Sequence, residues 1–182
     1  MLPQAGTHQH DEAQYTDSMA VPLFVVTPAR LALEPLVAQV EITGRLDGEG
    51  CGAVCTFIGV VRRSHAGRTV RYLEYEAHAT LAVRTFERIA HEAVERWPQA
   101  TLAIHHRVGR LAVGETSVLV AAAAAHRDEA FRVCRYGIER VKQIAPVWKR
   151  EVCEDGAHWI EGPVADPAND DLRRQALVRA CA

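Results

Sequence analysis

The stretch "VKQIAPVWKRE", residues 141–151, contains the end of a helix, a proline and the start of a strand. In residues 128–144, which overlap the start of this stretch, the apolar residues recur at helical spacing and form one stripe. Pro146 cannot continue that helix because it lacks a backbone N–H, and residues 147–153 have the pattern of a β-strand. The chain therefore reverses at Pro146, and Lys142 and Lys149 are expected to approach one edge of a sheet.

The patterns on either side of this stretch indicate the fold class. Strand patterns and helical stripes alternate in the order β-α-β-β-α-β, at 69–77, 79–97, 101–108, 116–125, 128–144 and 147–153. This order is the split βαβ pattern and predicts an α+β sandwich with both helices on one face of the sheet. Outside it we expect strands at 22–27 and 52–62, a short helix at 34–40, and turns at 63–68 and 109–115.

Length and composition predict one domain with two less regular ends. The chain has 182 residues, of which 48% are hydrophobic, enough for one well-buried core. Residues 1–20 are polar and aperiodic, which favours disorder. We therefore expect a disordered extension at 1–20, a folded domain at 21–162 and a C-terminal tail at 163–182.

Charge and cysteine content limit the classes of partner. The formal net charge is -2, so no global field favours nucleic acid or a membrane, and any anion site must be local. No segment has the pattern of a secretory signal, and the cytoplasm is the expected compartment. The five cysteines include no C-x-x-C pair and fit neither a disulfide framework nor a zinc site. We expect no metal and no cofactor.

Three places in the pattern could bind an anion. One is the Lys142–Lys149 pair, and another is Arg62 at a strand end before a glycine-bearing loop. The third is the start of the helix at 128, where His126 and Arg127 stand beside free backbone N–H groups. Each has a structural alternative, because cations at helix ends and strand edges are commonly just solvated. His106 lies on an apolar strand face and favours a core or interface role.

Four segments together resemble the catalytic large subunit of molybdopterin synthase. They are "TFIGVVR" (56–62) with Gly67, "HRVGRLAVGE" (106–115), "AHRDEAF" (125–131) and "VKQIAPVWKRE" (141–151). The resemblance covers about residues 20–162 and implies a hammerhead-type fold that contains the split βαβ unit. It also implies a homodimer that joins two small ubiquitin-like subunits in a heterotetramer. The implied reaction transfers two sulfurs from the small subunit's C-terminal thiocarboxylate to cyclic pyranopterin monophosphate (precursor Z), forming the dithiolene of molybdopterin.

The resemblance also implies roles for particular residues. Lys142 and Lys149 match the family's two active-site lysines, and Lys142 is the first choice for nucleophile or base. Lys149 would orient the thiocarboxylate or stabilise developing charge. Substrate-binding positions are matched by Arg62, His126, Arg127, Arg150, Glu151, Val60 and Val61. At Val60 some family members have a polar or basic residue, so this position would contribute backbone only.

Two other classes of function stay open on the sequence. One is a scaffold that binds a ubiquitin-like protein without chemistry. The other is a small-molecule anion-binding regulatory module, for which split βαβ folds are common. A reconstituted reaction distinguishes both classes from an enzyme, because only an enzyme forms product.

Overall fold

A computed structural model describes residues 20–46, 50–160 and 166–182. Residues 1–19, for which disorder is expected, lie outside the described part. The helices are α1 (Leu33–Leu46), α2 (Ala79–Arg96), α3 (Arg127–Ile144) and α4 (Asp170–Cys181). The strands are β1 (Phe24–Thr27), β2 (Ala53–Val60), β3 (Ser64–His65), β4 (Arg68–Ala77), β5 (Thr101–Arg107), β6 (Gly109–Ala112), β7 (Thr116–Ala124), β8 (Val147–Cys153) and β9 (Gly156–Ile160).

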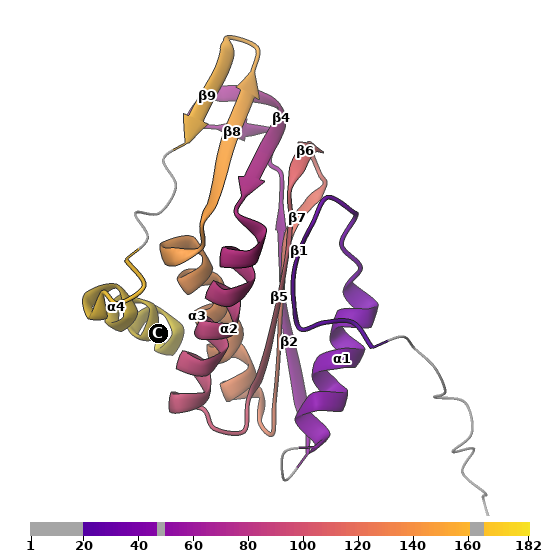
Figure 1. Ribbon diagram of the computed structural model, residues 1–182, viewed down its shortest axis with the longest axis vertical. Helices are drawn as coiled ribbons and strands as arrows, with labels where there is room; N and C mark the ends of the chain where they lie inside the picture. The colour runs from indigo at the N-terminus through magenta and orange to yellow at the C-terminus, as the bar shows by residue number, and fades with distance from the viewer. Residues whose placement is uncertain (1–19, 47–49, 161–165) are drawn as a thin grey trace, which may run out of the picture.

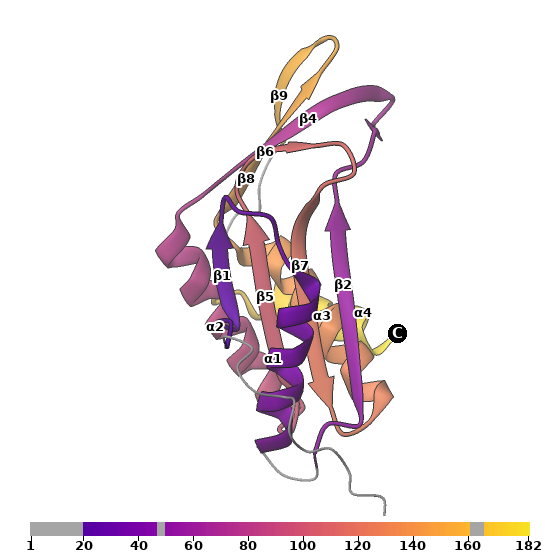
Figure 2. The same cartoon turned by 90° about the vertical axis from the view of Figure 1, so that its right-hand side faces the viewer.

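The first sheet has the strand order β1-β5-β7-β2 and carries the main core. Figure 2 shows these four strands side by side, with α1 across one face. Helices α2 and α3 cover the opposite face together, as the sequence pattern predicts (Figure 1). Their apolar stripes, which include Phe86, Ile89 and Val133, are fully buried against the sheet. Because β7 is covered on both faces, its sequence is almost continuously apolar.

The second sheet stands beyond one end of the first (Figure 1). Its strands have the order β3-β4-β8-β9, and β6 pairs with β4. The α+β class and the β-α-β-β-α-β order are confirmed. One part of the expectation is wrong, because the outer strands β4 and β8 pair with each other in this second sheet and the inner strands β5 and β7 lie in the first. Residues 109–115, expected to be only a turn, contain β6.

The C-terminal segment is packed rather than appended. Helix α4 begins after the N-cap Asn169, whose side chain accepts hydrogen bonds from two backbone N–H groups of the first turn. Ala176 and Ala180 of α4 are buried in the main core cluster, and the helix lies against α3. The segment expected to be a tail from residue 163 therefore contributes to the core from α4 onward.

Within the described residues, no helix has both the length and the apolar character that a membrane crossing requires.

Candidate active site

A cavity of about 610 Å³ lies at the junction of the two sheets, beside the C-terminal end of α3. Its wall comes from β2, β5 and β7 of the first sheet, from β4, β8 and β9 of the second, and from α3. The lining mixes apolar side chains such as Phe57, Ile138 and Val141 with three cationic ones. Elements far apart in the sequence thus build one partly apolar, positively charged hollow.

Lys142 and Lys149 both line this cavity. Helix α3 ends at Ile144, and Ala145, in an extended conformation, is its C-cap. Pro146 starts the new direction, and the deeply buried Ile144 and Ala145 fix the reversal in the core. Lys142 on the last helical turn and Lys149 on β8 therefore converge, as the sequence stretch predicts. They are also the only two lysines among 21 basic residues, the rest being arginines.

Arg62 is the third cation of the cavity. It follows β2, whose pairing with β7 shifts register between Gly59 and Val60. A side chain at Gly59 would collide with Val118, since an added Cβ would lie 2.5 Å from Val118 Cγ1. Among the described residues, no salt bridge involves Arg62 or Lys142, so the cavity presents two charges that an anionic ligand can neutralise.

The two valines before Arg62 have different positions. Val60 is exposed and lines the cavity, as the resemblance implies. Val61 is buried with Val70, Leu73 and Leu111 in the small core of the second sheet and does not line the cavity. Its backbone N–H donates to the Glu115 carbonyl oxygen at 3.0 Å. Val61 therefore serves packing and strand geometry here.

His126 and Arg127 lie at the other end of α3. His126 is the N-cap of the helix, Arg127 its first residue, and both are exposed. A helix rises 1.5 Å per residue, so His126 is about 24 Å along the axis from Lys142. Within one chain the structure does not bring this pair to the cavity that holds the lysines.

Arg150 and Glu151 point to opposite faces of β8. Arg150 forms an ion pair with Glu74 and stacks over Trp159, with 5.7 Å between Cζ and the ring centroid, outside the cavity lining. Glu151 is 3% exposed and accepts hydrogen bonds from His65 Nδ1 at 2.9 Å and from Lys149 Nζ at 3.2 Å. Glu151 thus holds the ammonium group of Lys149 instead of facing the ligand space directly.

Three further polar residues of the lining, Tyr75, His106 and Ser117, were not among the sequence candidates. His106 is buried, as its apolar strand face predicts, but the same face ends in the cavity wall. Tyr75 is the cross-strand partner of Lys149. That pairing was the only signal that could have identified it, and it exists only once β4 and β8 are known to be neighbours.

Replacing Glu151 by glutamine should destabilise the fold in a pH-dependent way. Burial raises the pKa of Glu151, but the hydrogen bonds from His65 and Lys149 outweigh burial, so the pKa lies below its usual 4.5. The carboxylate therefore contributes stability above pH 4.5, and this contribution disappears as the pH falls through the lower folded value. We expect Glu151→Gln to cost about 1–3 kcal/mol in urea unfolding at pH 7, with a smaller difference in acid.

The matched control for this prediction is Glu74→Gln on the neighbouring strand. Glu74 also pairs with a cation, Arg150, but both side chains are partly exposed. Its loss should cost less than about 1 kcal/mol. Equal stability of Glu151→Gln and the unaltered protein at pH 7, or a difference that grows on acidification, would contradict the role given to Glu151.

The fold and the cavity define an α+β protein with a cationic, lysine-bearing pocket. A family model described as "MoaE protein" matches residues 26–144. A molybdopterin synthase catalytic subunit of Halalkalibacterium halodurans is 39% identical over 137 residues, covering 74% of this chain and 87% of that protein. Its counterpart in Pyrococcus abyssi is 43% identical over 122 residues, with coverages of 67% and 82%.

A solved structure agrees with these relatives. The crystal structure of molybdopterin synthase from Staphylococcus aureus has a TM-score of 0.71 and 35% identity, and the match covers 78% of this chain and 98% of that one. The chain belongs to the MoaE family, the family of molybdopterin synthase catalytic subunits. The resemblance expected from the four sequence segments is confirmed.

Proposed function

We propose that this protein transfers sulfur from the C-terminal thiocarboxylate of a small ubiquitin-like subunit to cyclic pyranopterin monophosphate. Two such transfers form the dithiolene of molybdopterin. The observation that carries the proposal is that the only two lysines of the sequence both line the cationic cavity. All the other lysine or arginine positions of the sequence carry arginine, and an arginine cannot give up its proton in a protein. Lysine at these two places fits chemistry that needs an amine.

The lysines have different surroundings and so different proposed roles. Lys142 is exposed at the end of α3 and has no salt-bridge partner among the described residues, which suits a nucleophile or general base. Lys149 is held by Glu151 at 3.2 Å, which orients its ammonium group. This suits an electrostatic role towards the thiocarboxylate or towards charge that develops on oxygen. Arg62 would bind the cyclic phosphate.

The proposed partner is a small ubiquitin-like sulfur carrier, and the proposed compartment is the cytoplasm. The curated relatives are named catalytic subunits, a name that implies at least one further subunit. The sulfur donor must reach the lysines, so the carrier's C-terminal tail would enter the cavity. Two copies of each chain would form the working assembly.

A reconstituted assay tests this function. The protein is combined with cyclic pyranopterin monophosphate and a thiocarboxylated small subunit, and the dithiolene product is detected after oxidation to its fluorescent pterin. Product formation supports the proposal. Absence of product, when binding of the small subunit has been demonstrated, would indicate a non-catalytic scaffold. Tight binding of the pterin without turnover would indicate the regulatory module.

His126 and Arg127 are proposed to act in the site of a second protomer. His126 lies about 24 Å along α3 from Lys142 of its own chain and cannot reach it, whereas a homodimer can bring one chain's helix start to the other's cavity. Arg127→Ala and Lys149→Ala homodimers should each be inactive. Mixing the two variants should restore about a quarter of the normal rate, because half of the dimers are mixed and each has one intact site.

Two outcomes would contradict the shared site. Full activity of the Arg127→Ala homodimer would show that Arg127 has no part in the reaction. Two inactive homodimers whose mixture stays inactive, although subunit exchange is demonstrated by mass spectrometry, would show that both residues are needed in one chain.

A further inference from the structure

The cavity that holds the lysines also contains an uncharged hydrogen-bond acceptor. His106, near the end of β5, is 6% exposed and lines the cavity. It is the only histidine of the lining as the structure describes it. Neither the charge of the site nor its lysine chemistry accounts for a buried imidazole at this place.

The tautomer of His106 follows from its backbone contact. Nδ1 lies 2.9 Å from the carbonyl oxygen of Arg107, which can only accept a hydrogen bond, so Nδ1 carries the proton. Burial lowers the pKa of His106 to about 4, although the bond to Arg107 acts in the opposite direction, so the ring is neutral at pH 7. The second nitrogen, Nε2, is therefore an acceptor, and it has no hydrogen-bond partner in the described part of the chain.

The neighbours of His106 hold the ring without occupying Nε2. The Tyr75 ring packs edge-to-face on the imidazole, with 5.2 Å between centroids and an interplanar angle of 68°. The hydroxyl of Ser117, another residue of the cavity lining, donates to the Gly59 carbonyl oxygen at 3.1 Å. The acceptor is thus fixed in orientation by packing on one side and by the Arg107 carbonyl on the other.

We propose that His106 is a specificity-determining residue whose Nε2 accepts a hydrogen bond from a ring N–H of the pterin substrate. The inference rests on the proposed function and deepens it. Cyclic pyranopterin monophosphate has an anionic phosphate and a heterocycle that bears several N–H donors. Arg62 and the lysines attract any phosphate, whereas a fixed acceptor favours only ligands that place a donor against it. A buried acceptor left without its donor weakens binding of a wrong ligand.

Calorimetric titration with cyclic pyranopterin monophosphate tests the assignment. His106→Phe keeps a planar ring of similar size but removes the acceptor, and its dissociation constant should rise at least about tenfold. His106→Gln places an amide oxygen near the position of Nε2 and should stay within about threefold of the unaltered protein. The matched control is His105→Phe, since His105 is equally buried, bonds to the Pro22 carbonyl oxygen at 2.7 Å and does not line the cavity.

Inorganic phosphate serves as the second probe, because it presents the anion without the heterocycle. The dissociation constant of phosphate, obtained from its competition with the pterin, should be the same in His106→Phe and in the unaltered protein. If pterin binding were unchanged in His106→Phe, or if both probes weakened equally, the assignment would be wrong. Failure of the unaltered protein to bind the pterin would contradict the proposed function instead.

If His106→Phe does not fold, a second pair of variants still tests the assignment. His106→Gln and His106→Asn both keep a polar side chain, but only glutamine reaches the position of Nε2. Asparagine should therefore bind the pterin at least about tenfold more weakly than glutamine. Equal binding by these two variants would overturn the assignment.

Discussion

Replacing Lys142 by alanine should lower product formation in the reconstituted assay by at least about a hundredfold. Lys142 lies in the cavity with no counter-ion among the described residues. The sequence has one further lysine, Lys149, to which a different role is given. Lys149→Ala should have a comparable effect because the electrostatic element facing the reacting group is lost. Binding of the small subunit, measured separately, should survive both changes.

Arginine substitutions separate the two roles. Lys142→Arg keeps the positive charge but cannot supply a neutral amine, so it should be as inactive as the alanine variant. Lys149→Arg keeps the proposed electrostatic function and should retain measurable turnover. Arg174→Ala is the control, because Arg174 is exposed on α4 and pairs only with Asp171 among the described residues. Near-normal turnover in Lys142→Ala, together with complete loss in Lys149→Ala, would reverse the assignment.

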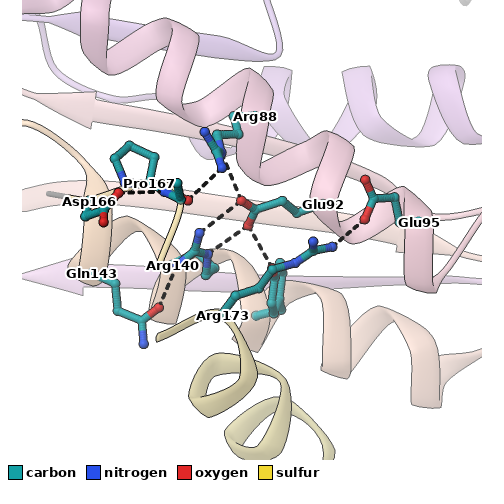
Figure 3. Close-up of polar contacts among 10 residues, drawn as sticks. Arg88, Glu92, Glu95, Arg140, Gln143, Asp166, Pro167 and Arg173 are labelled. Atoms are coloured by element: carbon teal, nitrogen blue, oxygen red, sulfur yellow. Dashed lines mark hydrogen bonds and ion pairs between the residues drawn. The ribbon is translucent and has the colours of Figure 1, made fainter. Parts of the chain in front are cut away.

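Replacing Glu92 by leucine should be the most destabilising of the changes considered. Glu92 on α2 accepts two hydrogen bonds from Arg140, at 2.8 and 2.9 Å (Figure 3). It accepts a third from the Tyr136 hydroxyl at 2.8 Å. Arg140 on α3 has no solvent exposure. Leucine would leave a buried guanidinium without its counter-charge, at a cost of about 3–5 kcal/mol in urea unfolding at pH 7.

Two comparisons sharpen this prediction. Arg140→Met added to Glu92→Leu should recover part of the lost stability, since two apolar side chains can replace a buried pair. Glu95→Ala on the same helix removes an exposed ion pair with Arg173 and should cost less than about 1 kcal/mol. A single variant Glu92→Leu no less stable than Glu95→Ala would refute the argument.

The pH dependence of the Glu92 variant gives an independent check. Burial raises the pKa of Glu92, but the hydrogen bonds from Arg140 and Tyr136 outweigh it, so the pKa lies below 4.5. The contribution of this carboxylate is therefore present above pH 4.5 and is lost as the pH falls through the folded value. The stability difference between Glu92→Leu and the unaltered protein should shrink in acid.

The same network shows why part of the structure was not predictable. Figure 3 shows Arg88 of α2 reaching both Glu92 and the Pro167 carbonyl oxygen, and Arg173 of α4 reaching Glu95. These contacts attach the C-terminal segment to the helix layer. No local pattern in residues 166–182 indicates that surface, because it is formed only when α2 and α3 are already side by side.

The separation of His126 from the lysines was predictable in principle. The resemblance implies roles in one reaction for His126 and for the lysines, although His126 and Lys142 lie near opposite ends of the 18-residue helix α3. The rise of the helix alone excludes a common contact within one chain. A joint role of His126 and Lys142 in one site would therefore require two chains, as in the shared site proposed above.

Local sequence patterns predict helices α1, α2 and α3, most strands, the α+β class and the convergence of Lys142 with Lys149. These depend on local rules: the helical and strand periods and the inability of Pro146 to continue a helix. Long-range contacts place β4 and β8 outside the first sheet and bury Val61 while Val60 lines the cavity. They also bring His106 and Tyr75 into the cavity wall and Glu151 against Lys149. These features arise from pairings between residues that are distant in sequence, because a strand's pattern shows which side chains share a face but not which strand lies beside it.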